Sequence, residues 1–301
     1  MANIILLIIC LLAGLILRWT GRFPESTPSA LNGFVIHISL PAAAILHIHA
    51  LRLDSSMLFT PLMAWLLFGV AWLFFHLSGR LFSLPPRTVG ALVLVGGLGN
   101  TSFVGLPMIE AYYGRDMLGI GILADQLGTF MTLATLGILA ATIYSSGNAS
   151  PRQMLQKVLF FPPFQALLLA LILRPVTFPA WSVTVLQKLA DTITPLALAS
   201  VGFQLRFTSL NGLRTRLALG LVYKLLLGPV LIAGLYLGLI GLRGTPIQVT
   251  IFEAAMAPMI TAGIIAMDHD LDPPLVTMML GIGIPLSFVT LPVWSMLLRG
   301  F

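Results

Sequence analysis

The sequence predicts an all-α membrane protein with ten transmembrane helices, because its composition is strongly apolar and apolar runs recur along the whole chain. Of its 301 residues, 58% are hydrophobic and 9% are charged, whereas soluble domains have roughly 45–50% and about 25%. The 16 Lys and Arg and the 10 Asp and Glu are too few to cover a soluble surface of this size. The composition therefore excludes a soluble domain, a disordered chain and a disulfide scaffold.

The expected spans are runs long enough to cross about 30 Å of hydrocarbon, which takes roughly 20 helical residues. Short breaks rich in Gly, Pro and charged residues separate them, and none could hold a separate domain. The first run has no basic residue before it and no small-residue cleavage site after it, so we expect a membrane helix rather than a signal peptide. The ten spans cover residues 3–19, 30–51, 57–79, 88–112, 117–145, 154–174, 181–205, 214–241, 246–267 and 274–298.

Basic residues predict the orientation, because Lys and Arg are retained on the cytoplasmic side of a membrane. They stand singly at the ends of apolar runs, so the net charge of +6 indicates membrane edges rather than a nucleic-acid partner. One side carries nine: Arg18, Arg22, Arg80, Arg87, Arg152, Lys157, Arg206, Arg214 and Arg216. The other carries five: Arg52, Arg115, Arg174, Arg243 and Arg299. We expect a multi-pass protein of a cell membrane, such as the bacterial inner membrane, with both termini non-cytoplasmic.

The two halves of the chain resemble each other. Prolines stand at similar positions in both: Pro41 and Pro107 in the first half, Pro195 and Pro258 in the second. Two five-helix repeats are therefore predicted, at residues 1–150 and 151–301. Because five is odd, the second repeat enters the membrane from the opposite side, an inverted arrangement that is common in secondary transporters.

The fourth and ninth spans are predicted to be broken helices. The fourth concentrates helix breakers and polar groups: Gly96, Gly97, Gly99, Asn100, Thr101, Ser102, Gly105 and Pro107. The ninth places Pro258 before Met259 and Thr261, with Glu253 five residues earlier. Broken helices at membrane depth are tolerated where they line a cavity or bind something: their N-termini favour anions and unwound carbonyls favour cations. The alternative is a Pro kink with close Gly packing.

Ionisable residues inside apolar runs are costly and therefore point to function. The sequence offers Asp125, Asp191, Lys224 and Glu253, with Glu110 nearer a span end. Gln126 and Thr129 extend Asp125 into a polar patch that could hold a proton or a cation. The alternative is an Asp–Lys pair, involving Lys224, that only fixes helix packing.

Several tempting motifs fail on their context, so no metal or cofactor is expected. Asp268, Asp270 and Asp272 mimic a calcium loop, but Pro273 replaces the required Gly. They are expected to cap the last helix instead. The histidines lack a metal-binding motif, and the lone Cys10 cannot form an intrachain disulfide.

Six segments carry a resemblance to a known family: FVIHISLPAAAI, GNTSFVGLPM, ADQLGTF, LADTITPLALASVGFQL, KLLLGPV and EAAMAPMITAGIIA. The chain resembles the auxin efflux carriers over nearly its whole length. The resemblance implies a scaffold of helices 1, 2, 6 and 7, a mobile unit of helices 3 to 5 and 8 to 10, and a substrate site where helices 4 and 9 cross. It also implies a homodimer through the scaffold.

The chain lacks the long loop between helices 5 and 6 of the plant members and their paired Asn-Pro-x-x-Tyr-like motif. The resemblance to bacterial members therefore implies a small carboxylate, such as malonate or malate, more than an auxin-like acid.

We expect a secondary transporter that moves a small organic anion by alternating access. The expected substrate-binding residues are Asn100, Thr101, Ser102, Pro107, Pro258, Met259 and Thr261. The expected ion-coupling residues are Asp125, Gln126, Thr129, Lys224 and Glu253. A carboxylate at position 125 favours H⁺ over Na⁺, because it can bind and release a proton. The alternatives are a sodium symporter of the bile-acid type and a transporter-like ligand sensor. An enzyme is not expected, since no nucleophile stands with a base.

Overall fold

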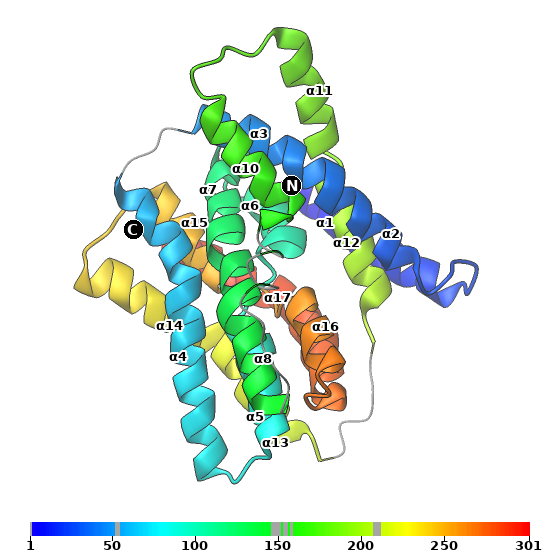
Figure 1. Ribbon diagram of the computed structural model, residues 1–301, viewed down its shortest axis with the longest axis vertical. Coiled ribbons are helices and arrows are strands. Elements are labelled where there is room, and N and C mark those ends of the chain that lie inside the picture. The colour runs from blue at the N-terminus through cyan, green and yellow to red at the C-terminus, as the bar shows by residue number, and fades with distance from the viewer. Residues whose placement is uncertain (1, 52–54, 146–151, 153–155, 157–158, 207–211) are drawn as a thin grey trace. The chain divides into compact units, whose positions relative to one another are not determined.

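The computed structural model describes residues 2–51, 55–145, 152, 156, 159–206 and 212–301, and every named element in this part of the chain is a helix. Figure 1 shows the helices in chain order. Helices suit a chain in lipid, because a helix satisfies its own backbone hydrogen bonds. The all-α prediction is therefore confirmed.

Five described helices are long and apolar enough to cross a membrane: Thr27–Ala50, Phe59–Leu81, Arg115–Ser145, Arg214–Leu239 and Pro273–Leu298. Three apolar helices are shorter: Ile5–Trp19, Pro86–Gly96 and Pro162–Ile172. The apolar helices that the structure describes are thus of unequal length. The chain is a multi-pass membrane protein, and ten complete crossings remain a prediction.

The chain divides into two compact units, and each takes segments from both halves of the sequence. Unit 1 comprises Met1–Asp54, Ser102–Ile122 and Gln156–Leu205. Unit 2 comprises Ser55–Thr101, Leu123–Leu155 and Arg206–Phe301. The two expected repeats, at 1–150 and 151–301, divide the sequence differently from these units, because each unit contains segments of both repeats. The repeats stay a prediction.

Unit 1 contains mostly short helices. Its elements are α1 (Ala2–Trp19), α2 (Thr27–Phe34), η1 (Val35–Ser39), α3 (Leu40–Ala50), α6 (Leu106–Tyr112), η5 (Arg115–Met117), α7 (Leu118–Leu123), α10 (Pro162–Ile172), α11 (Ala180–Ala190) and α12 (Ile193–Gln204). The π-helical segment η4 (Thr101–Gly105) leads into α6, and α7 ends one residue beyond the unit.

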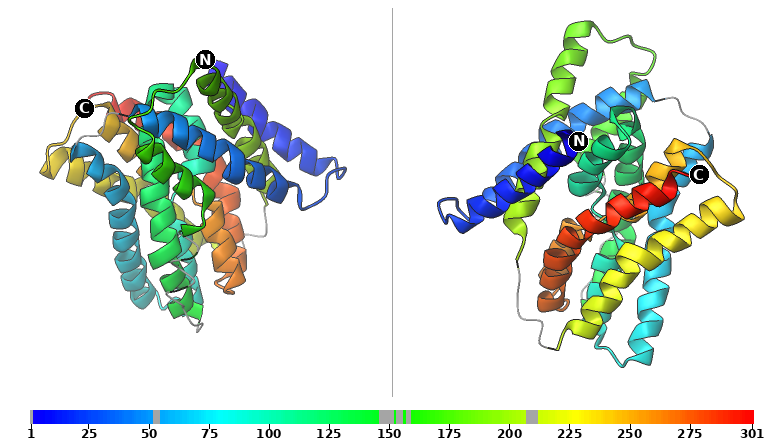
Figure 2. Two further views of the ribbon diagram at one scale, coloured as in Figure 1. Left: turned by 45° about the horizontal axis from the view of Figure 1, so that its top comes forward. Right: turned by 180° about the vertical axis from the view of Figure 1, so that it is seen from behind.

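Backbone contact between α1 and α12 holds part of unit 1 together, and Figures 1 and 2 show the two helices side by side. A Cβ atom on Gly14 would lie 2.0 Å from the carbonyl oxygen of Ala199, and one on Gly202 would lie 2.0 Å from that of Leu11. Only glycine permits this approach, which is typical of helix packing in membranes. The guanidinium of Arg18 donates to the carbonyl of Leu205 at 2.6 Å.

The expected seventh span, 181–205, is two helices rather than one. α11 ends at Ala190 and α12 begins at Ile193. Thr192 turns its hydroxyl to the carbonyl of Leu189 at 2.6 Å, and Pro195 in the first turn of α12 has no N–H to continue a helix from α11.

Unit 2 contains longer helices with π-helical segments. Its elements are η2 (Ser55–Leu58), α4 (Phe59–Leu81), α5 (Pro86–Ala91), η3 (Leu92–Gly96), η6 (Ala124–Phe130), η7 (Leu133–Gly137), α8 (Ile138–Ser145), α13 (Arg214–Val222), η8 (Tyr223–Leu227), α14 (Gly228–Ala233), η9 (Gly234–Leu239), α15 (Thr245–Ala254), α16 (Ile260–Asp268) and α17 (Pro273–Leu298). The π-helical segments include the ones that carry Asp125 and Lys224, and such segments are frequent at functional sites.

Polar groups in the core of unit 2 bond to backbone carbonyls. The hydroxyl of Tyr223 donates to Leu67 at 2.9 Å, and the indole of Trp294 donates to Leu225 at 3.0 Å. Each bond joins two separate helices in an apolar setting where an unpaired donor would be costly. These bonds fix the helices that surround the polar residues described below.

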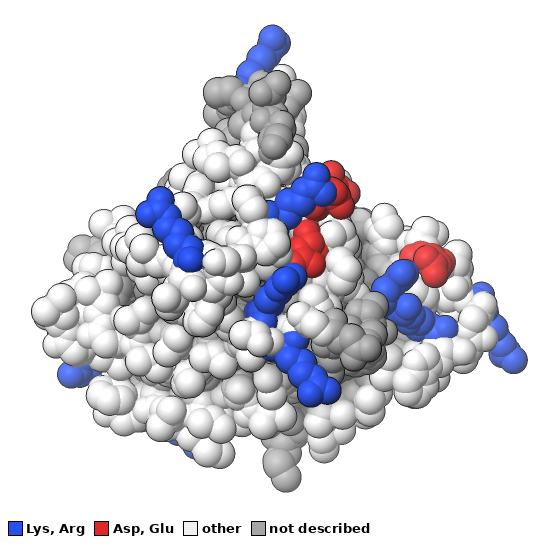
Figure 3. Space-filling view, turned by 90° about the horizontal axis from the view of Figure 1, so that it is seen from below, with Lys and Arg blue, Asp and Glu red and all other residues white. Residues whose placement is uncertain are grey.

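Of the three aspartates expected to cap the last helix, Asp272 caps α17, whereas Asp268 ends α16. One of its carboxylate oxygens accepts the backbone N–H of Leu275 at 3.4 Å. The other accepts the hydroxyl of Thr88 at 2.6 Å and lies 3.5 Å from the guanidinium of Arg216. Asp270 pairs with Arg87 on the surface. The face in Figure 3 shows such charges as a minority among uncharged side chains.

Candidate substrate and coupling site

Two helix breaks meet inside unit 2. The first separates η3, which ends at Gly96, from η4, which begins at Thr101. The second separates α15, which ends at Ala254, from α16, which begins at Ile260. Both predicted breaks are thus present in the structure.

The two broken segments pair as a short antiparallel bridge between Gly99 and Pro258. The N–H of Asn100 donates to the carbonyl of Ala257 at 2.8 Å, and the N–H of Met259 donates to that of Leu98 at 3.1 Å. These two bonds satisfy backbone groups that a continuous helix would have satisfied internally. The breaks therefore support each other and form one structure.

The residues at the bridge explain why the chain unwinds there. Pro258 has no N–H and cannot continue α15. A Cβ atom on Gly99 would lie 3.2 Å from the Nζ atom of Lys224 and 3.4 Å from the carbonyl oxygen of Glu253. Gly99 thus lets the bridge approach the side chain of Lys224 closely. Pro258 packs in turn on α17, where a Cβ on Gly283 would lie 2.7 Å from its ring.

Asp125 lies beside the first break and is only 2% exposed. One carboxylate oxygen accepts the hydroxyl of Thr101 at 2.6 Å, and the other accepts the side-chain amide of Gln126 at 2.5 Å. Thr129, one turn further along, is buried as well. The three residues of the predicted polar patch are thus all buried, Thr101 adds a contact from the broken helix, and the role of the patch stays a prediction.

Lys224 and Glu253 are completely enclosed, at 0% and 1% exposure. The ammonium of Lys224 donates to the carbonyl of Ala254 at 2.9 Å. Within the described part of the chain, neither carboxylate oxygen of Glu253 has a hydrogen-bond partner. The carboxylate interacts electrostatically with both Lys224 and Asp125. The hydrogen bond of Lys224 thus goes to a backbone carbonyl rather than to Asp125.

The remaining predicted substrate residues fall into two groups. Met259 is buried and extended just before α16, and Thr261 is exposed in the first turn of that helix. Ser102 and Pro107 belong to unit 1, both buried, with Pro107 at the start of α6. The matched spacing of Pro107 and Pro258 describes equivalent positions of the two predicted repeats, and it stays a prediction; in the structure, Pro258 pairs with Gly99.

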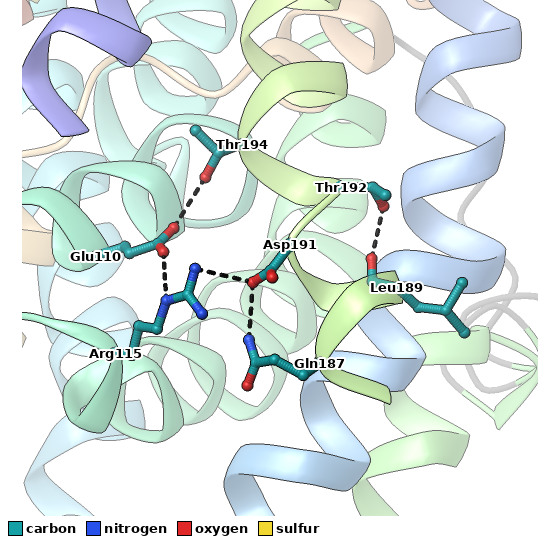
Figure 4. Close-up of polar contacts among 7 residues, drawn as sticks. All are labelled: Glu110, Arg115, Gln187, Leu189, Asp191, Thr192 and Thr194. Atoms are coloured by element: carbon teal, nitrogen blue, oxygen red, sulfur yellow. Dashed lines mark hydrogen bonds and ion pairs between the residues drawn. The ribbon is translucent and has the colours of Figure 1, made fainter. Parts of the chain in front are cut away.

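A second polar cluster, in unit 1, surrounds Arg115. Figure 4 shows its guanidinium between the carboxylates of Glu110, at 2.9 Å, and Asp191, at 3.1 Å. Gln187 donates to Asp191 at 2.8 Å, and Thr194 donates to Glu110 at 3.2 Å. Sequence reasoning selected the two acids as buried candidates and treated Arg115 as a membrane-edge charge.

The pair of Arg115 and Asp191 is substantially exposed, at 52% and 41%, whereas the side chain of Glu110 is 19% exposed. Exposed ion pairs contribute little free energy. We interpret the cluster as structural rather than functional: its contacts join α6 and η5 to α11 and α12.

A large groove in unit 2 is apolar. It has a volume of about 520 Å³ and runs between the α13–α14 segment and α17, lined by Leu, Val, Ala, Thr290 and Trp294. It offers almost no polar group to an anion, and an apolar surface of this kind suits lipid. No group of three His, Cys, Asp or Glu capable of holding a metal occurs among the residues that the structure describes.

Comparison with known proteins identifies the family. A family model described as membrane transport protein matches residues 1–295. The chain belongs to this family. Since the auxin efflux carriers are members, the resemblance seen in the sequence is confirmed. The family indicates a transporter rather than an enzyme.

Two relatives match nearly the full length of this chain. An uncharacterized transporter of Methanothermobacter thermautotrophicus is 28% identical over 299 residues, covering 98% of this chain and 97% of the relative. An uncharacterized transporter of Methanocaldococcus jannaschii is 25% identical over 308 residues, with the same coverage of both chains.

Proposed function

We propose that the protein is a secondary transporter that moves a small organic anion across the membrane by alternating access. The observation that carries this proposal is the pair of helix breaks joined at Gly99 and Pro258, with Asp125, Lys224 and Glu253 buried around them. Unwound backbone and buried charge at membrane depth are costly unless they serve a transported solute. Membership of a membrane transport family agrees with this reading.

The proposal includes ten helices in two inverted repeats, with helices 4 and 9 crossing at the site. Each half contributes one of the two breaks, which supports the repeat. The helix packing in unit 1 is compatible with it: α1 packs on α12, and α10 packs on α3. An inverted repeat relates these two pairs, because it exchanges helix 1 with helix 6 and helix 7 with helix 2.

The proposed anion position is beside the first turn of α16. The first N–H groups of a helix have no partner within the helix and carry partial positive charge, so they attract carboxylates. Thr261 is exposed in this turn, and Asn100 lies in the segment paired with the residues before it. A small carboxylate such as malonate or malate suits a site built from amides and hydroxyls, which can release the ligand again.

The proposed driving ion is H⁺. Asp125 and Glu253 are carboxylates, which can change their charge by binding a proton. Asp125 is tied to the broken helix through Thr101, so a change in its charge would act directly on the first break. Gln126 and Thr129 support Asp125 in this role.

Unit 1 is proposed as the scaffold and unit 2 as the mobile part. Unit 1 contains the helices expected for the scaffold, and also residues 102–122, which the family resemblance assigned to the mobile part. We further propose a homodimer through the scaffold, a bacterial inner-membrane location, and termini on the non-cytoplasmic side.

Uptake by proteoliposomes tests the proposal. Purified protein in liposomes should accumulate labelled malonate or malate when a pH gradient is imposed, and empty liposomes should not. A sodium symporter would accumulate the label only with a Na⁺ gradient. A ligand sensor would bind the acid in solution but leave the vesicle interior unlabelled, which would contradict transport.

A further inference from the structure

The ammonium of Lys224 lies where the two helix breaks meet. It donates to the carbonyl of Ala254, the last residue of α15. It is also the heavy atom nearest to the position that a Cβ atom on Gly99 would take, at 3.2 Å. The last carbonyls of a helix have no partner within the helix and carry partial negative charge. A cation is therefore favoured at this point.

Glu253 adds a buried carboxyl group to the same region, because its backbone carbonyl lies beside Gly99 and its neighbour Ala254 binds the ammonium. Both of its carboxylate oxygens are buried and have no hydrogen-bond donor among the described residues, while its electrostatic partners are Lys224 and Asp125. Carbonyl and carboxylate oxygens are the ligands that hard cations prefer. The surroundings of the ammonium thus resemble a site for a monovalent metal ion.

We propose that Lys224 is a built-in cation that occupies this position permanently and thereby excludes Na⁺ from the helix break. A buried ammonium that donates to the last carbonyl of a helix and interacts electrostatically with Glu253 supplies the positive charge that Na⁺ would otherwise bring. Transport should then be independent of Na⁺, and this consequence rests on the proposed function. The claim that Lys224 occupies the cation position at the helix break does not depend on the proposed function.

Removing the ammonium should open the position. With Lys224 replaced by Met, Asp125 and Glu253 would interact without a compensating charge, and the carbonyl of Ala254 would lose its donor. Met is long, unbranched and apolar, so it fills much of the same space. Sodium can then bind the freed oxygens and relieve the repulsion.

Thermal unfolding of the purified protein tests the proposal without any substrate. The parent should unfold at the same midpoint in NaCl, KCl and N-methylglucamine chloride of equal concentration. Lys224→Met should unfold at a higher midpoint in NaCl, by roughly 2 to 4 °C at a Na⁺ concentration tenfold above its Kd. Glu253→Gln in the same chain should abolish this gain. Lys188→Met, which removes an exposed lysine of α11, is the matched control and should behave like the parent.

A rise of the parent midpoint specific to Na⁺ would overturn the proposal, and this measurement needs no variant to fold. A folded Lys224→Met protein with equal midpoints in all three salts would overturn it as well. Failure of organic-anion uptake would instead reject the proposed function and leave the Na⁺ result as it stands.

Discussion

Asp125 shows how a single residue joins the helix break to a charge. Its carboxylate holds Thr101 of one broken helix and Gln126 of its own helix. Hydrogen bonds to an ionised carboxylate are stronger than those between neutral groups, so this pair of bonds holds the carboxylate in place. Protonation of Asp125 would weaken both bonds and alter the support of the break.

Asp125→Asn should separate substrate exchange from proton coupling. The amide has nearly the same shape but cannot bind and release a proton, so exchange of labelled for unlabelled anion should continue while accumulation driven by a pH gradient is lost. Asp116→Asn, at an exposed position, is the control and should accumulate anion normally. Normal gradient-driven accumulation by Asp125→Asn would remove this residue from the coupling mechanism.

At the scale of the helix, the sequence predicts where helices break better than it predicts which distant residues contact each other. Clusters of Gly, Pro and polar residues located both breaks, because Gly and Pro act on the local backbone. The pairing of Gly99 with Pro258 and the bond from Lys224 to Ala254 join segments far apart in the chain, and no periodicity encodes them. The charge count likewise gave no indication that Arg115 bridges two acids.

The contact between α1 and α12 predicts that replacing two different glycines by Ala has very different effects on stability. Gly202→Ala should lower the unfolding free energy by about 1–3 kcal/mol, because its methyl group would collide with the carbonyl of Leu11. Gly33→Ala, in α2 of the same unit, meets no atom within 4 Å and should leave the protein as stable or slightly more stable. Thermal unfolding in detergent would compare them, and equal midpoints would contradict the close contact.

The cap of α17 predicts that replacing two different aspartates by Ala also has different effects on stability. Asp272→Ala should cost about 0.5–2 kcal/mol, since it removes the acceptor for Leu275 and the contacts to Thr88 and Arg216. Asp268→Ala, at an exposed position at the end of α16, should cost less. The same unfolding experiment measures both, and a greater loss for Asp268→Ala would reject the cap as a source of stability.

At the scale of the whole molecule, the orientation rests on the basic residues of the sequence. The contacts agree with the side assigned to them: Arg18 reaches the end of α12, next to Arg206 in the chain, and Arg87 and Arg216 both pair with acids of the α16–α17 loop. Residues assigned to one side of the membrane are thus close together within each unit. The loop around Ser150, assigned to the same side, lies outside the described residues.

Cysteine labelling tests this orientation. In a Cys10→Ser background, a membrane-impermeant reagent added to intact cells should label Gly300→Cys and not Ser83→Cys, which lies between α4 and α5. Opening the cells should make both accessible and serves as the control. Labelling of Ser83→Cys alone in intact cells would reverse the orientation.

The central claim is that the organic anion binds at the paired helix breaks, and calorimetric titration of Asn100→Ala tests it most directly. Deleting one amide donor to a charged ligand removes roughly 1–3 kcal/mol, which is about a tenfold to hundredfold loss of affinity. Parent, Asn100→Ala and the exposed control Thr184→Ala would each be titrated with a panel of dicarboxylates and indole acids. We predict that only Asn100→Ala loses affinity for the best ligand. Equal affinity in all three folded proteins would place the binding site elsewhere.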